Sequence, residues 1–238
     1  MLSESTTHHT SETPAATRTG LLIVLEGGEG AGKTTQWKRL TVALTAAGHD
    51  VVALREPGGT PAGDDIRRLL LDPASDLAPE AEALLFAASR AQLVHTLIRP
   101  ALDRGAVVLV DRFLLSTLAY QGAGRGLSLE HLVQVNKLAT GGLTPDATLL
   151  LTLPLSDAMA RMVSRGGTDR IEEAGLAFHE RVQRAFVDAA DPAWLARHPE
   201  VGPVYLIEAS GSPEMVTVRC LEQLAACFPT SFAGVLHG

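Results

Sequence analysis

Five short apolar runs recur along the chain, separated by stretches in which apolar residues follow a helical period. The runs occupy residues 21–26, 50–54, 106–110, 147–153 and 203–207. The segments predicted to be helical are 34–47, 62–71, 78–104, 114–120, 128–140, 155–164, 170–190 and 212–227. Strands that alternate with helices predict a three-layer α/β fold, in which helices cover both faces of a five-stranded parallel sheet.

Proline and glycine mark the interruptions in this pattern. Pro100 should kink the long helix 78–104 or lie in its last turn. Gly166 and Gly167 break the pattern after Arg165, where a small lid covering about residues 155–172 could hinge. We predict one domain over residues 20–228, between a disordered N-terminal tail at 1–19 and a C-terminal tail at 229–238.

Composition narrows the possible functions. The chain of 238 residues has a formal net charge of −7, which argues against a sequence-independent nucleic-acid-binding protein. Its apolar runs are shorter than the ~18 residues that a membrane span requires. Its two cysteines, Cys220 and Cys227, are expected to pack in a helix rather than form a disulfide. A cytoplasmic location is the default expectation.

The first apolar run leads into a glycine-rich loop, and a predicted helix follows it. Residues 27–34 read GGEGAGKT, which fits the phosphate-binding pattern G-x-x-x-x-G-K-[ST]. Backbone N–H groups of such a loop surround nucleotide phosphates, with help from the helix N-terminus. Lys33 would reach the β- and γ-phosphates and the Thr34 hydroxyl would bind Mg²⁺. The candidate ATP-binding residues are Gly27, Gly28, Glu29, Gly30, Ala31, Gly32, Lys33, Thr34 and Thr35.

A second candidate site follows the run Val107–Val110, which ends in Asp111 and Arg112. A carboxylate at the end of a buried strand resembles the arrangement that holds Mg²⁺ in phosphate-loop enzymes. Because ligands bind at the carboxyl edge of parallel sheets, we expect Asp111 to lie close to Thr34. Arg112 could then neutralise a phosphate.

Several segments together resemble the thymidylate kinases, over about residues 20 to 225. They are residues 26–35, Arg55–Thr60, Leu85–Arg90, Asp111–Phe113, Ser116–Gly126 and Asp169–Glu172. The phosphate-binding loop is shared by a very large superfamily, whereas REPGG at 55–59 and AYQG at 119–122 are far more specific. The resemblance implies phosphoryl transfer from MgATP to dTMP on a P-loop fold, and a homodimer.

The resemblance also implies an acceptor site. Phe86 would stack on thymine and Arg90 would bond its exocyclic oxygen, since both lie on one helix face. Arg67 and Arg112 would hold the acceptor phosphate, and Glu29 the deoxyribose 3′-hydroxyl. The complete predicted dTMP set is Glu29, Pro57, Arg67, Phe86, Arg90, Arg112, Thr117, Tyr120 and Gln121.

The lid carries three arginines, Arg161, Arg165 and Arg170, whereas the variable positions of the phosphate loop carry none. The chain therefore resembles the lid-arginine type common in bacteria, and its expected catalytic residues are Lys33, Arg112 and Arg165. One departure concerns the fourth predicted strand, where Thr152 stands in place of an aspartate that relatives often carry.

Two alternatives remain open from the sequence. The chain could be a kinase for another nucleoside monophosphate, because specificity rests on the resemblance. It could also be a P-loop switch or ATP-binding module without turnover. A guanine-reading switch should carry N-K-x-D, but residues 136–139 read NKLA, so Ala139 replaces the required aspartate.

Overall fold

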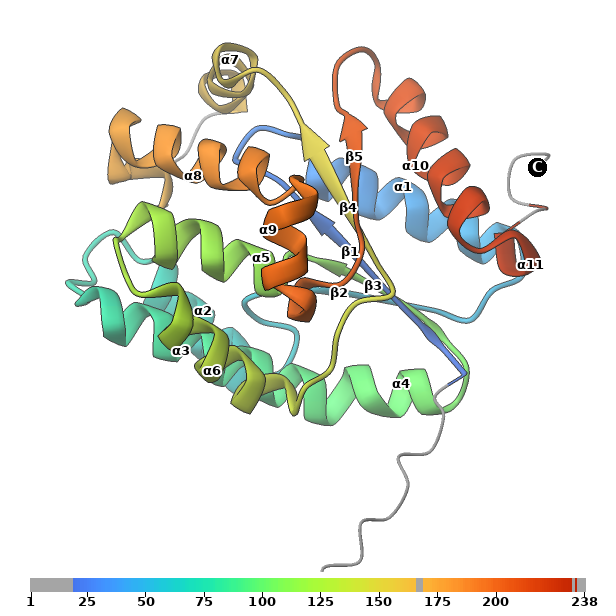
Figure 1. Ribbon diagram of the computed structural model, residues 1–238, viewed down its shortest axis with the longest axis horizontal. Coiled ribbons are helices and arrows are strands. Elements are labelled where there is room, and N and C mark those ends of the chain that lie inside the picture. Colours follow the sequence, from blue (N-terminus) through green and yellow to red (C-terminus); the bar gives the residue numbers. More distant parts are fainter. Residues whose placement is uncertain (1–18, 166–168, 233, 235–238) are drawn as a thin grey trace, which may run out of the picture.

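A five-stranded parallel sheet forms the centre of the molecule, as predicted (Figure 1). The computed structural model describes residues 19–165, 169–232 and 234, with the backbone alone for 162–165. Spatial order runs β2-β3-β1-β4-β5. The strands are β1 Leu21–Glu26, β2 Val51–Arg55, β3 Val107–Asp111, β4 Ala147–Thr152 and β5 Val204–Glu208.

The register of the sheet places the two candidate phosphate-site segments side by side. Leu25 pairs with Asp111, and Arg55 of β2 pairs with Asp111 from the other side. All five strands run parallel, so their carboxyl ends lie at one edge. The glycine-rich loop after β1 and the Asp111-Arg112 pair after β3 therefore meet at that edge.

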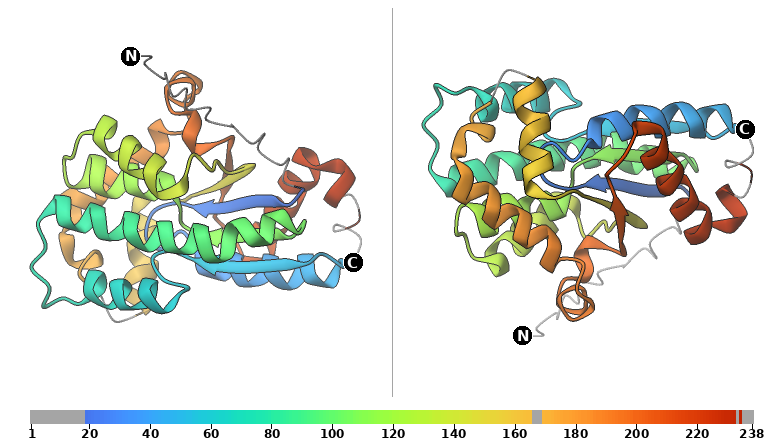
Figure 2. Two further views of the ribbon diagram at one scale, coloured as in Figure 1. Left: turned by 90° about the horizontal axis from the view of Figure 1, so that it is seen from below. Right: turned by 90° about the horizontal axis from the view of Figure 1, so that it is seen from above.

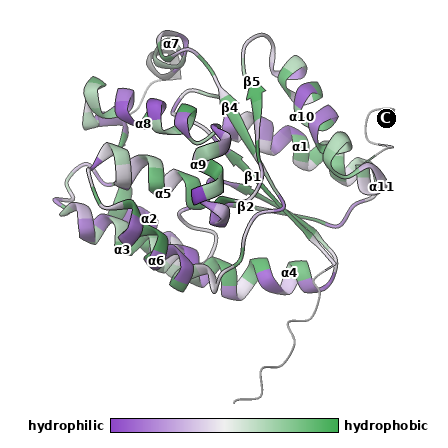
Figure 3. Cartoon of the chain, in the orientation of Figure 1, coloured by the Kyte–Doolittle hydropathy of each residue, from purple (hydrophilic) through white to green (hydrophobic). Residues whose placement is uncertain are grey.

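Alternate side chains of the central strand enter two separate cores. Leu22 and Val24 of β1 face one core, whereas Ile23 and Leu25 face the other. Helices lie on both sides of the sheet in both views of Figure 2. The strands are strongly hydrophobic, whereas the helices also carry hydrophilic residues (Figure 3).

One core lies beneath helices α1 Lys33–Ala46, α10 Pro213–Cys227 and α11 Pro229–Phe232. The larger core lies beneath a second group of helical segments on the opposite face. These are α3 Pro79–Leu93, η1 Val94–Ile98, α4 Arg99–Asp103, α5 Leu114–Thr117, η2 Leu118–Gly124, α6 Leu129–Thr140 and α8 Leu176–Asp188. The helix α2 Pro61–Leu71 packs against α3, and α7 Leu155–Arg165 follows β4.

The long predicted helix 78–104 is confirmed as a continuous helical stretch with a local change of pitch. The π-helical turn η1 separates α3 from α4, and Pro100 is the second residue of the short final segment. Proline has no N–H and cannot donate to the preceding turn, which is consistent with its place beside this irregular turn.

The predicted helix 170–190 is wrong in its first part. A 3₁₀ turn at η3 Glu172–Ala174 ends at Gly175, whose φ of 87° breaks the helix before α8 begins. A glycine adopts this backbone conformation without steric cost, so the chain turns here. The short segments α9 Pro192–Arg197 and η4 Pro199–Val201 were not predicted.

The fold also extends further toward the C-terminus than predicted. Residues Pro229–Phe232 form α11 rather than a tail, and Phe232 is fully buried with its ring 5.0 Å from the ring of His49. Residues 1–18 of the predicted N-terminal tail lie outside the described residues. Within the described part of the chain, no helix combines the length and apolarity needed to cross a membrane.

Candidate nucleotide-binding site

A cavity of about 920 Å³ opens at the carboxyl edge of the sheet. Its walls come from the glycine-rich loop, the ends of β2 and β3, and helices α2, α3 and α10. Such a volume falls in the range typical of small-molecule sites. Every residue predicted for the acceptor lines this one cavity, namely Glu29, Pro57, Arg67, Phe86, Arg90, Arg112, Thr117, Tyr120 and Gln121.

The glycine-rich loop adopts a conformation that requires its glycines. Gly30 and Gly32 have φ values of 73° and 93°, which side-chain-bearing residues rarely adopt. A methyl group on Gly30 would also lie 2.2 Å from the carbonyl oxygen of Ala158 in α7. The loop residues Glu29 to Thr35 line the cavity, whereas Gly27 and Gly28 do not.

Lys33 lies at the first position of α1 and is 5% exposed. Its ammonium group donates a hydrogen bond of 2.7 Å to the carbonyl of Gly28. Burial first and nearby Arg112 second lower the pKa of Lys33 to about 8, although the carboxylates of Glu29 and Asp111 oppose the shift. The side chain is thus held inside the loop where a nucleotide phosphate would lie.

Nucleotide binding should therefore take up protons at mildly alkaline pH. With a pKa of about 8, Lys33 is about half neutral at pH 8, and an adjacent triphosphate favours its charged form. We expect uptake of about half a proton per ATP bound at pH 8 and about a tenth at pH 7. Isothermal titration in buffers of different ionisation enthalpy measures this number. An equal proton count at both pH values would contradict the assignment of Lys33.

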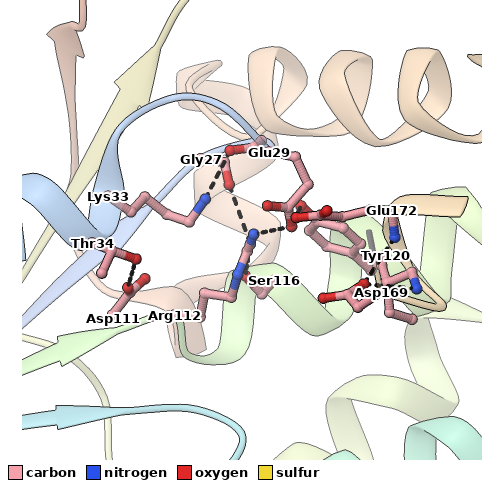
Figure 4. Close-up of polar contacts among 12 residues, drawn as sticks. Gly27, Glu29, Lys33, Thr34, Asp111, Arg112, Ser116, Tyr120, Asp169 and Glu172 are labelled. Carbon is pink, nitrogen blue, oxygen red and sulfur yellow. Dashed lines mark hydrogen bonds and ion pairs between the residues drawn. The ribbon is translucent and has the colours of Figure 1, made fainter. Parts of the chain in front are cut away.

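Thr34 and Asp111 come together as predicted (Figure 4). The Thr34 hydroxyl donates to Oδ2 of Asp111 over 2.9 Å, which links α1 to the end of β3. Among the described residues no group of three or more acidic, histidine or cysteine side chains could hold a metal. A hydroxyl and a carboxylate still fit Mg²⁺, which commonly takes one or two protein ligands plus phosphates and water.

Arg112 connects the loop to the acceptor side of the cavity (Figure 4). Its guanidinium donates to the Gly27 carbonyl over 3.2 Å and to the Ser116 hydroxyl over 3.1 Å, and it forms an ion pair with Glu29. Burial alone would lower the pKa of Arg112, but Glu29 and other negative groups outweigh it and raise that pKa. Arg112 has a φ of 71°, a left-handed conformation that is costly outside glycine.

Two further residues fix the neighbourhood of Arg112. Tyr120 donates to Glu29 over 3.0 Å, so the carboxylate predicted to contact a sugar already has two partners. Glu26 is fully buried and accepts from the backbone N–H groups of Phe113 and Ser116 at 2.8 and 3.0 Å. It thereby holds the start of α5, a role that the sequence analysis did not assign.

On the acceptor side, α2 presents Arg67 to the cavity. Thr60 caps this helix by accepting from the Gly63 N–H over 3.0 Å, and Pro61 occupies its first position. Arg67 then donates to the Pro57 carbonyl over 2.9 Å. Its pKa is lowered first by burial and then by nearby Arg55, so an anion here would relieve an unfavourable positive charge.

Arg90 is more firmly bound to the protein than the resemblance suggested. It is 2% exposed and donates to Glu56, Thr117, Asn136 and the Phe113 carbonyl, over 2.7, 3.0, 2.5 and 3.0 Å. Among the described residues these bonds use four of its five N–H groups, which leaves one for a ligand. Its contact with a base stays a prediction.

The arginines of the predicted lid do not share one place. Arg161 lines the cavity and donates to the Ala209 carbonyl over 3.1 Å. Arg170 instead donates to Glu82 over 2.7 Å and to the Leu70 carbonyl over 2.8 Å, and it does not line the cavity. The side chain of Arg165 lies outside the described residues, so its catalytic role stays a prediction.

The opposite end of the cavity was not predicted from the sequence. Ala209, Gly211, Pro213 and Val216 form this wall after β5. Gln36 holds it by donating to the Pro213 carbonyl over 2.9 Å. The glycine and proline that follow the last strand could have indicated a loop at the same edge.

Thr152, which stands where relatives often carry an aspartate, donates to the Ile207 carbonyl of β5 over 3.3 Å.

Comparison with known proteins agrees with this geometry. The family model for thymidylate kinase matches residues 25–199. A thymidylate kinase of Deinococcus radiodurans is 56% identical over 171 residues, covering 72% of this chain and 83% of that protein. One of Rhizorhabdus wittichii is 46% identical over 215 residues, covering 88% and 99%.

A solved structure extends the likeness to three dimensions. The crystal structure of thymidylate kinase from Ehrlichia chaffeensis superposes with a TM-score of 0.69 at 29% identity, covering 86% of this chain and 98% of that one. With the phosphate loop, the paired Thr34 and Asp111, and the acceptor residues in one cavity, the chain belongs to the thymidylate kinase family.

Proposed function

We propose that this protein transfers the terminal phosphoryl group of ATP to dTMP, giving ADP and dTDP. The observation that best supports the proposal is the shared cavity, which contains a phosphate loop and the whole predicted acceptor set. The volume of about 920 Å³ allows two ligands to meet within one cavity. Family membership supplies the identity of the two substrates.

In this proposal the protein acts by positioning and by neutralising charge. An oxygen of the dTMP phosphate attacks the γ-phosphorus of ATP. The bond from this phosphorus to the oxygen that bridges the β- and γ-phosphates breaks, and ADP leaves. The attacking oxygen is already anionic, so it needs no strong general base. Lys33 and Arg112 would offset the charge on the transferred group, and Arg165 would join them when the lid closes. Enclosure by the lid would exclude water, a competing acceptor.

Mg²⁺ would be held by Thr34 and Asp111 together with the ATP phosphates. When bound, the ion offsets phosphate charge. The hydrogen bond between Thr34 and Asp111 holds the two side chains together beside the cavity in the protein itself.

A kinase for another nucleoside monophosphate is the first alternative, and substrate comparison decides it. Coupled assay of ADP release with dTMP, dUMP, UMP, CMP and GMP should show the highest kcat/KM for dTMP. Hydrolysis of ATP at a rate independent of any acceptor, or no response to dTMP, would reject the proposal.

A guanine-reading switch is disfavoured by the surroundings of Asn136. This residue is 2% exposed in α6, and its Oδ1 accepts a 2.5 Å hydrogen bond from Arg90. It therefore serves the interior of the protein rather than a nucleotide base. The absence of an aspartate at Ala139 leads to the same conclusion.

Replacing Arg67 by alanine should weaken dTMP binding selectively. A charge-assisted contact to phosphate contributes about 1.5–3 kcal/mol, so we expect KM for dTMP to rise about 10- to 100-fold, with little change in KM for ATP. Arg68→Ala is the matched control, because Arg68 is the exposed neighbour paired with Asp65. Steady-state kinetics with each substrate varied measures both constants. Equal rises in the two KM values would contradict the assignment to the acceptor side.

We further propose a homodimer and a cytoplasmic location. The family resemblance supports the homodimer. The two proposed nucleotide substrates support the cytoplasmic location. Leu84 of α3 and Leu138 of α6 are 58% and 86% exposed on two helices that pack together, which makes this pair of helices the natural place to examine.

A further inference from the structure

Glu82 is a fully buried carboxylate in the first turn of α3. It accepts four hydrogen bonds from three residues that lie far away in the sequence. Oε1 accepts from the Gln121 side-chain amide over 2.8 Å and from Arg125 Nε over 3.2 Å. Oε2 accepts from Arg125 over 3.0 Å and from Arg170 over 2.7 Å. Burial favours the neutral acid, but these hydrogen bonds outweigh it and lower the pKa of Glu82, so the side chain is ionised near neutral pH.

An ionised carboxylate can only accept hydrogen bonds, which determines how Gln121 is oriented. The amide nitrogen of Gln121 must face Glu82, so the amide oxygen must point to the other side. Gln121 lines the nucleotide cavity together with Phe86 and Arg90, the residues predicted to hold a base. Among the described residues, the Gln121 side chain makes its hydrogen bond through the amide nitrogen.

We propose that Glu82 is a positioning residue that keeps the amide oxygen of Gln121 toward the acceptor base, so that the cavity selects bases with an N–H at ring position 3. This inference depends on the proposed function, because it concerns the same acceptor site. Thymine and uracil carry a hydrogen at N3, whereas cytosine has a lone pair there. The fixed oxygen accepts from the first two bases and repels the third.

The energetic consequence is a preference that sugar and phosphate contacts cannot provide. Opposing two acceptors leaves both unsatisfied, and each unsatisfied group typically costs about 1–3 kcal/mol, or about 5- to 150-fold in affinity. The best substrate pair to measure this is dUMP and dCMP, which share sugar and phosphate and differ only at ring positions 3 and 4. We expect the unmodified enzyme to prefer dUMP to dCMP by about 100-fold in kcat/KM.

Glu82→Gln is the decisive variant. Oε2 receives hydrogen bonds from two arginines, whereas Oε1 receives a longer one from Arg125 Nε and one from the Gln121 amide, which can turn over. The amide oxygen of the new side chain should therefore occupy the Oε2 position. Its NH₂ group would then face Gln121 and require that amide to turn over. We expect the dUMP-to-dCMP ratio of kcat/KM to fall at least about tenfold. Glu80→Gln is the matched control, an exposed carboxylate in the same helical turn, and should leave the ratio unchanged.

A double exchange separates positioning from general support of the fold. In Glu82→Gln with Gln121→Glu, the carboxylate at position 121 presents an acceptor to the base again, so the preference for dUMP should return. A merely structural role of Glu82 predicts no such recovery. A folded Glu82→Gln protein with an unchanged ratio would overturn the inference.

The unmodified enzyme provides a test that needs no variant. Equal use of dCMP and dUMP would overturn the inference while ATP-dependent phosphorylation of dTMP left the proposed function intact. Lack of any dTMP phosphorylation would instead reject the proposed function itself. The two failures are therefore distinguishable in one set of assays.

Discussion

Lys33→Ala should lower kcat about 1,000-fold, in line with the loss of a single charged stabilising group at a phosphoryl-transfer centre. Lys33 is the cation that the loop itself encloses, held 2.7 Å from the Gly28 carbonyl. On nucleotide binding, its ammonium group can exchange that carbonyl for phosphate oxygens without moving far. The Lys33 side chain is only 5% exposed, and electrostatic stabilisation by a buried charge is larger than in water.

The same substitution should leave the fold intact. A buried cation whose pKa is lowered by desolvation is unfavourable to the folded state, so its removal offsets the loss of one hydrogen bond. Lys38→Ala is the control, because Lys38 is exposed on the same helix. Single-turnover kinetics and thermal unfolding measure the two effects. A Lys33→Ala protein with more than a tenth of the normal kcat would contradict the catalytic role.

Removal of the Arg112 guanidinium should also reduce kcat/KM about 1,000-fold, since a cation between two phosphates stabilises charge on both. This side chain reaches the Gly27 carbonyl, the Ser116 hydroxyl and the Glu29 carboxylate, so its loss also leaves Glu29 without its ion pair. We therefore expect impaired use of both substrates, unlike the selective effect at Arg67.

The backbone at this position allows a cleaner design than alanine alone. Arg112 has a φ of 71°, which glycine adopts freely and alanine does not. Arg112→Gly should be more stable than Arg112→Ala by about 1 kcal/mol, with the same loss of activity. Urea unfolding and steady-state kinetics test the two parts separately. Arg104→Ala serves as control, because Arg104 is half exposed and pairs with Asp50 away from the cavity. Retained activity in Arg112→Gly would show that the guanidinium is dispensable.

Much of this site could be predicted because its residues belong to local patterns. The loop from Gly27 to Thr34 lies between a strand and a helix, and Asp111 ends a wholly apolar strand. Parallel strands bring such ends to one edge, so the contact between Thr34 and Asp111 follows from topology. The acceptor residues came from family resemblance, and their common cavity agrees with it.

Residues whose roles depend on distant partners could not be predicted. Glu82 lies 88 residues from Arg170 in sequence, and nothing local to either residue indicates their hydrogen bond. The helix expected from residue 170 is interrupted because Gly175 adopts a positive φ that a hydrophobic pattern does not reveal. Likewise, the burial of Phe232 depends on packing near His49, in the loop that follows α1.

Gly30 gives the molecule a mechanical property. Its backbone lies so close to Ala158 that even a methyl group would meet the carbonyl oxygen at 2.2 Å, so the loop is in direct contact with α7, which forms part of the predicted lid. We therefore expect a movement of α7 to shift the loop as well. A side chain at residue 30 would force the phosphate loop and α7 apart, so the glycine at this position permits their close contact.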